Sequence, residues 1–449
     1  MHLYVKKLRD KCGDFWWYSL LMFLACRSGD AVQAFIGLWL VPKFVPQNEL
    51  GAALPILQVG SVFGLPMAIL VVPFSRWLTI YSARGERGKI KRLLSITFCG
   101  VVVAFLLAAV IAKFLLPMVF DRISIVNGSL GLLMICVGLI GPFSSVFSNA
   151  LQGLKRFGAM AFIQFLGAPF RLAVMLVAMP FRALSGYMLG QAAGPALSVA
   201  FSCWSLRKEL GKDVKSEKLG SEDCRAMFKY TLPISVYITL GILLGAWQTL
   251  LFRQRLPEIE SAAFYMISRL GEVAAYAALA LMAIAFPLAV EETHNNQEKG
   301  KSILGKVLMG SLGAGLAVSA VLLLFGSKIL AILPSGRDYV PYSSLMVVYA
   351  LRISFSAACG AFFSFETAAG RFSFLWYWVP ITLFETGSLV VLSGYGAFNG
   401  ILPISILDWM ASFRATRLCF YVWWLFALSL VQLAVIAIHL SARKYFQKR

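Results

Sequence analysis

The stretch NALQGLKRFGAMAFIQFLGAPFRLAV, residues 149–174, sets the architecture of the chain. Two apolar runs flank a short basic turn at Lys155 and Arg156, and the second run carries Arg171 near its middle. Apolar runs of about 20 residues are long enough to cross a bilayer as helices. The stretch therefore predicts a helical hairpin in a membrane, with an arginine that the apolar surroundings must somehow accommodate.

The whole chain follows this pattern. It is 59% hydrophobic and only 14% charged, whereas soluble domains average about 25% charged residues. We expect an all-α integral membrane protein with twelve transmembrane helices. The predicted spans are 15–41, 51–75, 93–116, 128–150, 158–180, 183–205, 228–252, 262–288, 303–325, 341–368, 372–394 and 418–440.

The basic residues predict the orientation. With the N-terminus inside, and with the loops counted a few residues past the span ends, the inner segments hold 27 of the 41 Lys and Arg residues and the outer segments hold ten. The remaining four are arginines that lie deeper within spans. Cytoplasmic loops carry such an excess. We therefore expect a multi-pass membrane protein with both termini in the cytoplasm. The same excess explains most of the net charge of +20, so no nucleic-acid partner is needed.

A weak internal repeat divides the spans into two sets of six. FVPQNELGAA (44–53) parallels RLPEIESAAF (255–264), and three further pairs of segments follow in the same order. Repeats with an even number of spans face the same way and relate by a two-fold axis along the membrane normal. We predict a six-helix bundle over 1–205, a cytoplasmic linker over 206–227 and a second six-helix bundle over 228–449, with a pseudo-two-fold between the bundles.

Segment 401–417 has apolar residues at helical spacing. It is interpreted as an amphipathic helix on the outer surface, or alternatively as an extension of the last span. The eight cysteines and three histidines follow no spacing typical of a disulfide framework or a zinc site. No metal, cofactor or catalytic residue is predicted. The absence of a phosphate-binding loop of the GxxxxGK[ST] type indicates that the chain is not itself an ATPase.

Four arginines within spans are the candidate site residues: Arg27, Arg171, Arg269 and Arg352. An arginine near the bilayer centre costs roughly 2.5–3.5 kcal/mol on insertion scales, so each must face a water-filled cavity or a partner. The guanidinium fork suits phosphate and carboxylate oxygens. Four arginines with three acidic companions therefore favour an anionic substrate.

The acidic companions are Asp30, Glu272 and Glu385. Asp30 and Glu272 each lie three residues after an arginine, on one helix face and within reach of it. Such pairs either line a binding site or only hold helices together. Glu385 is a possible cross-helix partner for Arg171 or Arg352, or else a proton carrier for coupling.

The hairpin of residues 149–174 also resembles the segment between the fourth and fifth helices of bacterial polysaccharide flippases. These belong to the multidrug/oligosaccharidyl-lipid/polysaccharide exporter superfamily. FKYTLPISVYITLGILLG (228–245), FGSKILAILPSGRDYVPYSSLMVVYAL (325–351) and FETAAGR (365–371) resemble later segments of the same family. Many members have an aspartate in the middle of the seventh helix, where this chain reads LGAWQTLLF (244–252).

The resemblance implies a flippase of the bacterial cytoplasmic (inner) membrane, not an enzyme. It would move an undecaprenyl-diphosphate-linked oligosaccharide by alternating access during cell-surface polysaccharide biosynthesis. It implies a cavity between two bundles, lined by Arg27 and Arg269 at places similar to arginines of the related lipid II flippases. The expected partners are the lipid-linked glycan, membrane lipids, and possible complexes with a glycan polymerase or glycosyltransferases.

Two alternatives remain open at this point. One is a cation-coupled multidrug exporter of the same architecture, against which the excess of arginine argues. The other is a non-transporting membrane subunit of a glycan assembly complex, in which the arginine pairs are only structural.

Overall fold

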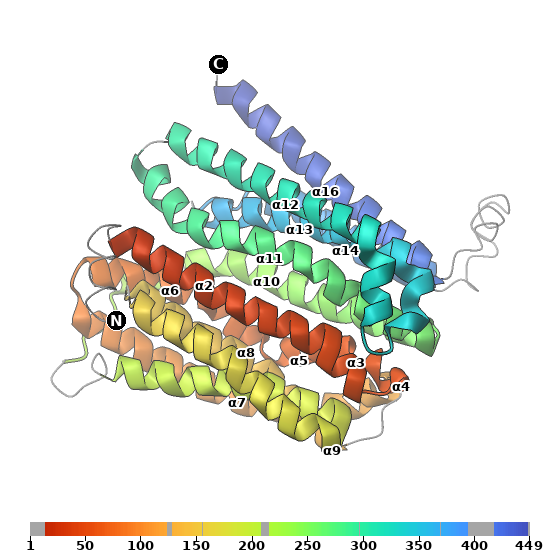
Figure 1. Ribbon diagram of the computed structural model, residues 1–449. Coiled ribbons are helices and arrows are strands. Elements are labelled where there is room, and N and C mark those ends of the chain that lie inside the picture. The colour runs from red at the N-terminus through yellow and green to blue at the C-terminus, as the bar shows by residue number, and fades with distance from the viewer. Residues whose placement is uncertain are drawn as a thin grey trace. The chain divides into compact units, whose positions relative to one another are not determined.

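The chain is helical throughout the part that the structure describes (Figure 1). This computed structural model describes residues 14–123, 128–154, 156–207, 215–295, 297–368, 370–393 and 417–447. Each of the twelve predicted spans coincides with helix, so the all-α prediction is confirmed. The predicted amphipathic helix at 401–417 lies outside the described residues except for its last position.

In chain order the helices are α2 (Asp14–Phe35), the π-helix η1 (Ile36–Leu40), α3 (Val41–Phe44), α4 (Gln47–Leu50), α5 (Ala53–Phe63), α6 (Leu65–Ala83), α7 (Arg87–Ile123), α8 (Gly128–Gly153), α9 (Phe157–Leu206), α10 (Ser221–Arg255), α11 (Glu258–Asn295), α12 (Gln297–Ile332), the 3-10 helix η2 (Gly336–Tyr342), α13 (Ser343–Ala368), α14 (Leu375–Ser393) and α16 (Arg417–Gln447). Among the described residues, eight helices are long and apolar enough to cross a membrane by length and composition alone.

Glycine and proline determine where several helices begin. The predicted second span is divided at Gly64, which precedes α6 and is followed by Pro66 in the first helical turn. Pro46 has an extended backbone, with φ −63° and ψ 155°, directly before α4. Proline suits these positions because the first turn of a helix leaves its N–H groups without helical partners.

The helices form two compact units. The first unit comprises Met1–Ile36 and Ile56–Ala246, and the second comprises Gly37–Pro55 and Trp247–Arg449. The predicted boundary at 206–227 separates the two sets of six spans, whereas the compact units divide within α10, after Ala246. Helix α10 therefore contributes residues to both units.

In the first unit, α8 packs against α6 and α9, and α2 packs against α9. A buried apolar cluster joins α6, α7, α8 and α9, and fully buried Leu78 and Tyr81 of α6 lie within it. Near this cluster, Lys89 at the start of α7 contacts Asp223 at the start of α10, with Nζ 3.2 Å from Oδ2. The backbone N–H of Glu217 donates to the Gly88 carbonyl at 3.2 Å, so the segment before α10 is held against α7.

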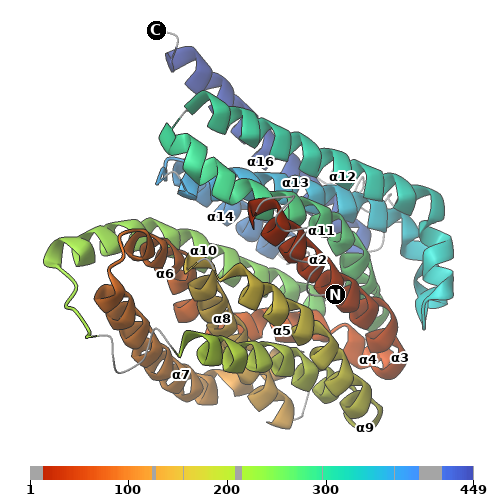
Figure 2. The ribbon, with the colours of Figure 1, turned by 60° about the vertical axis from the view of Figure 1, so that its left-hand side comes forward.

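In the second unit, α11, α12 and α13 lie side by side, and α16 packs against α13 (Figure 2). Aromatic rings connect these helices. The Phe264 ring of α11 lies 4.7 Å from Phe252 and 5.7 Å from Tyr349 of α13, measured between centroids. The two segments that the sequence repeat aligns also meet in this unit, where the Ser261 hydroxyl donates to the Gly51 carbonyl at 3.3 Å.

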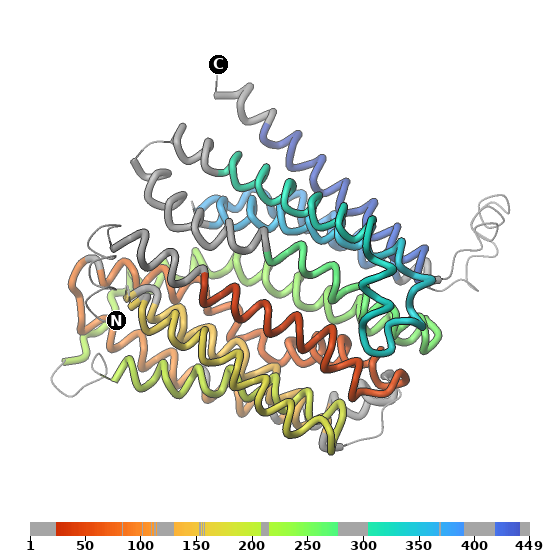
Figure 3. The backbone as a smooth tube through the Cα atoms, viewed as in Figure 1, coloured from red at the N-terminus to blue at the C-terminus, as the bar shows by residue number. Residues whose placement is uncertain are grey.

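Helix α9 holds both the fifth and the sixth predicted span, and its path can be followed in Figure 3. The backbone leaves helical geometry at Arg182 and at Ala183, whose φ of 27° is in the positive region that non-glycine residues rarely adopt. Beyond this turn, Gly186 approaches the backbone of Ala178. The two halves of α9 therefore pack together as a hairpin, and its turn falls between the predicted spans 158–180 and 183–205.

Candidate functional site

Arg27 and Asp30 form an ion pair on α2. The distance from Nη2 to Oδ2 is 2.9 Å, and the two side chains are 25% and 30% exposed. The pair follows directly from the helix, because residues three apart lie on the same face. The predicted contact is therefore present, with both charges only partly shielded from the surroundings.

Arg171 reaches across from α9 to α2. Its Nη1 donates a hydrogen bond of 2.6 Å to Oε1 of Gln33. Gln33 follows Asp30 by three residues, as Asp30 follows Arg27. An amide oxygen accepts this hydrogen bond without carrying a formal charge, so the contact holds the guanidinium and does not neutralise it.

A row of small residues allows Arg171 to lie where it does. The second half of α9 carries Gly186, Gly190, Gly194 and Ser198 at intervals of four residues. This is the small-xxx-small pattern that lets membrane helices approach closely. A Cβ atom added at Gly194 would lie 3.0 Å from Nε of Arg171 and 3.1 Å from the Gly167 carbonyl oxygen, so the arginine passes over the bare backbone of the opposite helix.

Arg269 and Glu272 form the corresponding pair on α11, in the second unit. Nη1 of Arg269 donates to Oε2 of Glu272 at 2.7 Å, and the arginine side chain is 11% exposed. The guanidinium also lies 5.3 Å from the centre of the Tyr265 ring. A tight hydrogen bond and a cation–π contact together satisfy much of the charge of this arginine.

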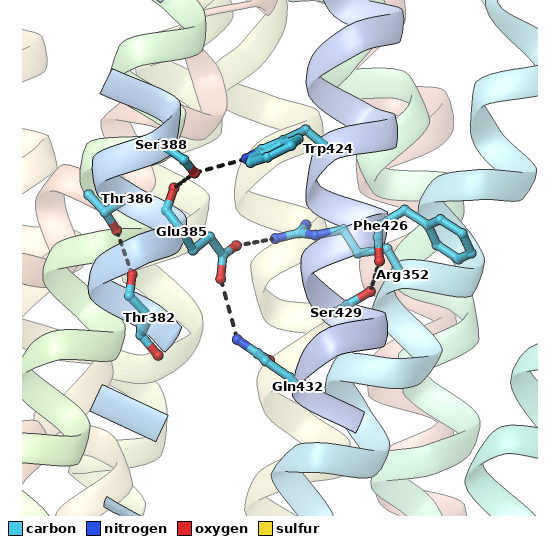
Figure 4. Close-up of polar contacts among 9 residues, drawn as sticks. All are labelled: Arg352, Thr382, Glu385, Thr386, Ser388, Trp424, Phe426, Ser429 and Gln432. Carbon is cyan, nitrogen blue, oxygen red and sulfur yellow. Dashed lines mark hydrogen bonds and ion pairs between the residues drawn. The ribbon is translucent and has the colours of Figure 1, made fainter. Parts of the chain in front are cut away.

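Arg352 of α13 faces Glu385 of α14 (Figure 4). Nη2 lies 3.8 Å from Oε1, and the side chains are 13% and 17% exposed. The second carboxylate oxygen of Glu385 lies 3.4 Å from Nε2 of Gln432 on α16. One helical turn away, the indole N–H of Trp424 donates to the Ser388 hydroxyl at 2.9 Å. Glu385 therefore links three helices through two long polar contacts.

The structure thus separates the four arginines by the kind of partner. Arg27, Arg269 and Arg352 each lie beside a carboxylate, whereas the hydrogen bond from Arg171 goes to an amide. Counting these four arginines and three acids, the formal charge is +1 in the first unit and zero in the second. The one excess positive charge of these seven residues therefore falls in the first unit.

Sequence reasoning did not single out Gln33, Gly194 or Gln432. Gln33 and Gly194 could have been found, the first from the continued spacing of three after Arg27 and Asp30, and the second from the glycine repeat. Gln432 has no such signal. In the part of the chain described, no group of three or more His, Cys, Asp or Glu residues could hold a metal ion.

Comparison with solved structures identifies the fold. A Vibrio cholerae MATE transporter matches with a TM-score of 0.64 over 99% of this chain and 98% of its own, at 14% identity. An inward-facing multidrug resistance MATE family transporter of the MOP superfamily gives 0.62 over 94% and 96%, at 15% identity. A MOP superfamily transporter from Pyrococcus furiosus, for which a reverse polarity of the binding pocket suggests a different function, gives 0.62 over 98% of both chains, at 15% identity.

The chain therefore has the fold of these transporters, with twelve transmembrane helices in two bundles, as the sequence predicts. No protein-family model matches the sequence, and no curated protein matches it significantly.

Proposed function

We propose that the chain is a membrane exporter that moves an undecaprenyl-diphosphate-linked oligosaccharide across the cytoplasmic membrane by alternating access. Arg171 carries the proposal, because it lies within a predicted span and the uncharged amide of Gln33 accepts a hydrogen bond from its guanidinium. A diphosphate offers the paired oxygens that a guanidinium fork binds. Arg27, Asp30, Arg269 and Arg352 are proposed to line the path of the headgroup.

The fold supports a transporter and is compatible with more than one substrate. One structural neighbour is a multidrug transporter, and another is a transporter with a binding pocket of reverse polarity. A multidrug exporter is the second candidate, favoured by the neutral total charge of the arginines and acids in the second unit. In that case Glu385 would be the coupling carboxylate instead of a partner of Arg352 alone.

Transport in proteoliposomes tests this proposal. The purified protein is reconstituted with a fluorescent undecaprenyl-diphosphate-linked disaccharide, and movement between leaflets is followed by quenching from one side. We expect movement with the unaltered protein, partial movement with Arg171→Lys, which keeps the charge and loses the fork, and none with Arg171→Ala. The alanine variant should still accumulate in the membrane, because the Gln33 amide that loses its hydrogen bond carries no charge.

Ethidium efflux from the same proteoliposomes is the matched measurement for the second candidate. Efflux of ethidium without movement of the lipid-linked disaccharide would replace the first proposal with the multidrug exporter. Movement of neither compound would favour the non-transporting subunit. Full lipid movement with Arg171→Ala would show that this arginine takes no essential part.

A further inference from the structure

We propose that Glu385 binds a proton when an anionic headgroup draws Arg352 away from it, so that binding of the headgroup takes up a proton. The proposal rests on the proposed function for the identity of the anion. Protonation of Glu385 in the absence of Arg352 is a separate claim and can be tested without any ligand.

The two ion pairs of the second unit differ in length and in the helices that they join. Arg269 and Glu272 lie three residues apart on α11, and their hydrogen bond of 2.7 Å needs no second helix. Arg352 and Glu385 lie on α13 and α14, and the 3.8 Å between Nη2 and Oε1 is longer than a hydrogen bond. Of these two pairs, only Arg352–Glu385 depends on the separation of two helices, so only this pair can part when one helix moves against the other.

Arg352 is held loosely by its neighbours. Its Nε is buried and has no hydrogen-bond partner within the described part of the chain. Apart from Glu385, the guanidinium contacts Tyr349 one turn earlier on α13, through a side-chain hydrogen bond and with its carbon 5.3 Å from the ring centre. A phosphate oxygen typically lies about 2.8 Å from a guanidinium nitrogen, closer than the Glu385 carboxylate does. An anionic headgroup can therefore compete with Glu385 for this arginine.

Once Arg352 is withdrawn, the contacts of Glu385 that remain among the described residues are with uncharged groups (Figure 4). Its Oε2 lies 3.4 Å from Nε2 of Gln432 on α16, while the Trp424 indole nearby donates to the Ser388 hydroxyl. Keeping a carboxylate charged in an apolar span is costly, and one proton removes that charge. The Gln432 amide suits both states of Glu385, because its N–H group donates to a carboxylate and its oxygen accepts from a carboxylic acid.

The exchange balances in charge. Before binding, Arg352 faces the Glu385 carboxylate, and the pair is neutral. After binding, Arg352 faces a phosphate oxygen, and the carboxylate has taken one proton from solution to become a carboxylic acid. Among the described residues, the other charged or titratable groups close by are Tyr349 on α13 and, interacting with it, Arg269 and Glu272 on α11. Their charges do not change, so no charge loses its partner in either state, as an apolar span requires.

The proton on Glu385 can be detected in the full chain without a ligand. Infrared spectroscopy distinguishes a carboxylic acid from a carboxylate by its C=O stretch, and the difference spectrum of two variants isolates one group. At neutral pH, Arg352→Gln should show one more carboxylic acid than the unaltered protein, and the double variant Arg352→Gln/Glu385→Gln should not. Arg352→Lys is the matched control, because it keeps a cation beside Glu385 and should show no additional acid.

A missing acid band in Arg352→Gln would overturn the proposal, because Glu385 would then stay charged without its arginine.

Proton uptake on binding is measured by calorimetry of the full chain in nanodiscs. The probe is farnesyl diphosphate, a water-soluble polyprenyl diphosphate, and farnesol is the uncharged control. Titrations in two buffers with different heats of ionisation count the protons taken up. We expect about one proton more per bound diphosphate for the unaltered protein than for Glu385→Gln, which imitates the protonated acid. Glu272→Gln, which alters the short pair, should keep this additional proton.

The same linkage predicts the pH dependence. Because binding takes up a proton, it is favoured at low pH, and one proton corresponds to about a tenfold change in affinity per pH unit. Around neutral pH, the affinity of the unaltered protein should therefore fall about tenfold more per unit rise in pH than that of Glu385→Gln. The variant Arg352→Leu/Glu385→Leu, which leaves no unpaired charge, should bind more weakly and take up no additional proton.

The outcomes separate the two claims. Equal proton counts for the unaltered protein and both Glu385 variants, with farnesyl diphosphate preferred over farnesol, would overturn the proposal. No preference for farnesyl diphosphate over farnesol, together with the additional acid in Arg352→Gln, would contradict the proposed function and leave the proton site at Glu385 standing.

Discussion

A single residue type, arginine within an apolar helix, is accommodated here in three different ways. Arg27 and Arg269 use an acid three residues later on the same helix. Arg352 uses Glu385 on another helix, and Arg171 uses the amide of Gln33. The first arrangement depends only on helical spacing and was predictable. The other two depend on which helices are neighbours, and the sequence does not specify this. The sequence therefore left open whether Glu385 pairs with Arg171 or with Arg352.

Breaking the Arg352–Glu385 pair should destabilise the protein more than replacing it. Glu385→Ala leaves the Arg352 guanidinium, which is 13% exposed, without its carboxylate. Removing one member of a buried pair typically costs about 3–5 kcal/mol, whereas apolar replacement of both members is often neutral. We expect a clear fall in the midpoint of thermal unfolding in detergent for Glu385→Ala, and recovery of most of it in the double variant Arg352→Leu/Glu385→Leu.

An unchanged unfolding midpoint for Glu385→Ala would contradict the predicted destabilisation. It would mean that the 3.8 Å contact contributes little and that Glu385 is held for another purpose, such as coupling. The Arg269–Glu272 pair on α11 is the comparison for the Arg352–Glu385 pair, because its hydrogen bond of 2.7 Å is shorter and joins two residues of one helix.

At the scale of the element, the spans and the break within α9 were predictable, whereas the interruption of the second span was not. Apolar runs of about 20 residues identify spans because backbone groups in lipid must be satisfied within the helix. The turn at Arg182 and Ala183 falls between the predicted spans 158–180 and 183–205. The span 51–75, in contrast, was predicted without the interruption at Gly64. The glycine series from Gly186 to Gly194 was visible in the sequence. Its spacing of four residues is typical of membrane helices that approach closely, as the two halves of α9 do.

Gly186 should be the least replaceable member of this series. An added Cβ would lie 2.7 Å from the backbone carbonyl carbon of Ala178 and from the backbone nitrogen of Met179, and neither atom can move independently of the helix. We expect Gly186→Ala to lower the thermal unfolding midpoint and the yield of folded protein. Gly241→Ala on α10 is the matched control, because nothing lies within 4 Å of its added Cβ. That variant should be neutral or slightly stabilising, by up to about 1 kcal/mol, from its higher helix propensity. Equal behaviour of the two variants would show that the hairpin is less tightly packed than these distances indicate.

At the scale of the whole molecule, the distribution of basic residues predicts the orientation and also accounts for most of the net charge. A charge of +20 on a chain with only 21 acidic residues would suggest a polyanionic partner in a soluble protein. Here 27 of the 41 basic residues fall in segments on one side of the predicted spans. The basic residues within the spans have a different explanation, because a charge within the membrane must contact polar side chains of the protein or bind a ligand. The distribution of basic residues therefore predicts the topology, and only the few internal arginines are proposed to bear on the substrate.

The charge asymmetry makes a definite prediction for the topology. Basic residues resist transfer across the membrane, and an excess of 27 over ten between the two sides strongly favours the inner location for the richer side. Green fluorescent protein, which becomes fluorescent only in the cytoplasm, should fluoresce when fused after Arg449. The same reporter inserted at Asn399, between the last two predicted spans, should be dark, and alkaline phosphatase at that position should be active. The reverse pattern would place both termini outside, and it would also reverse the side from which the headgroup is proposed to approach Arg171.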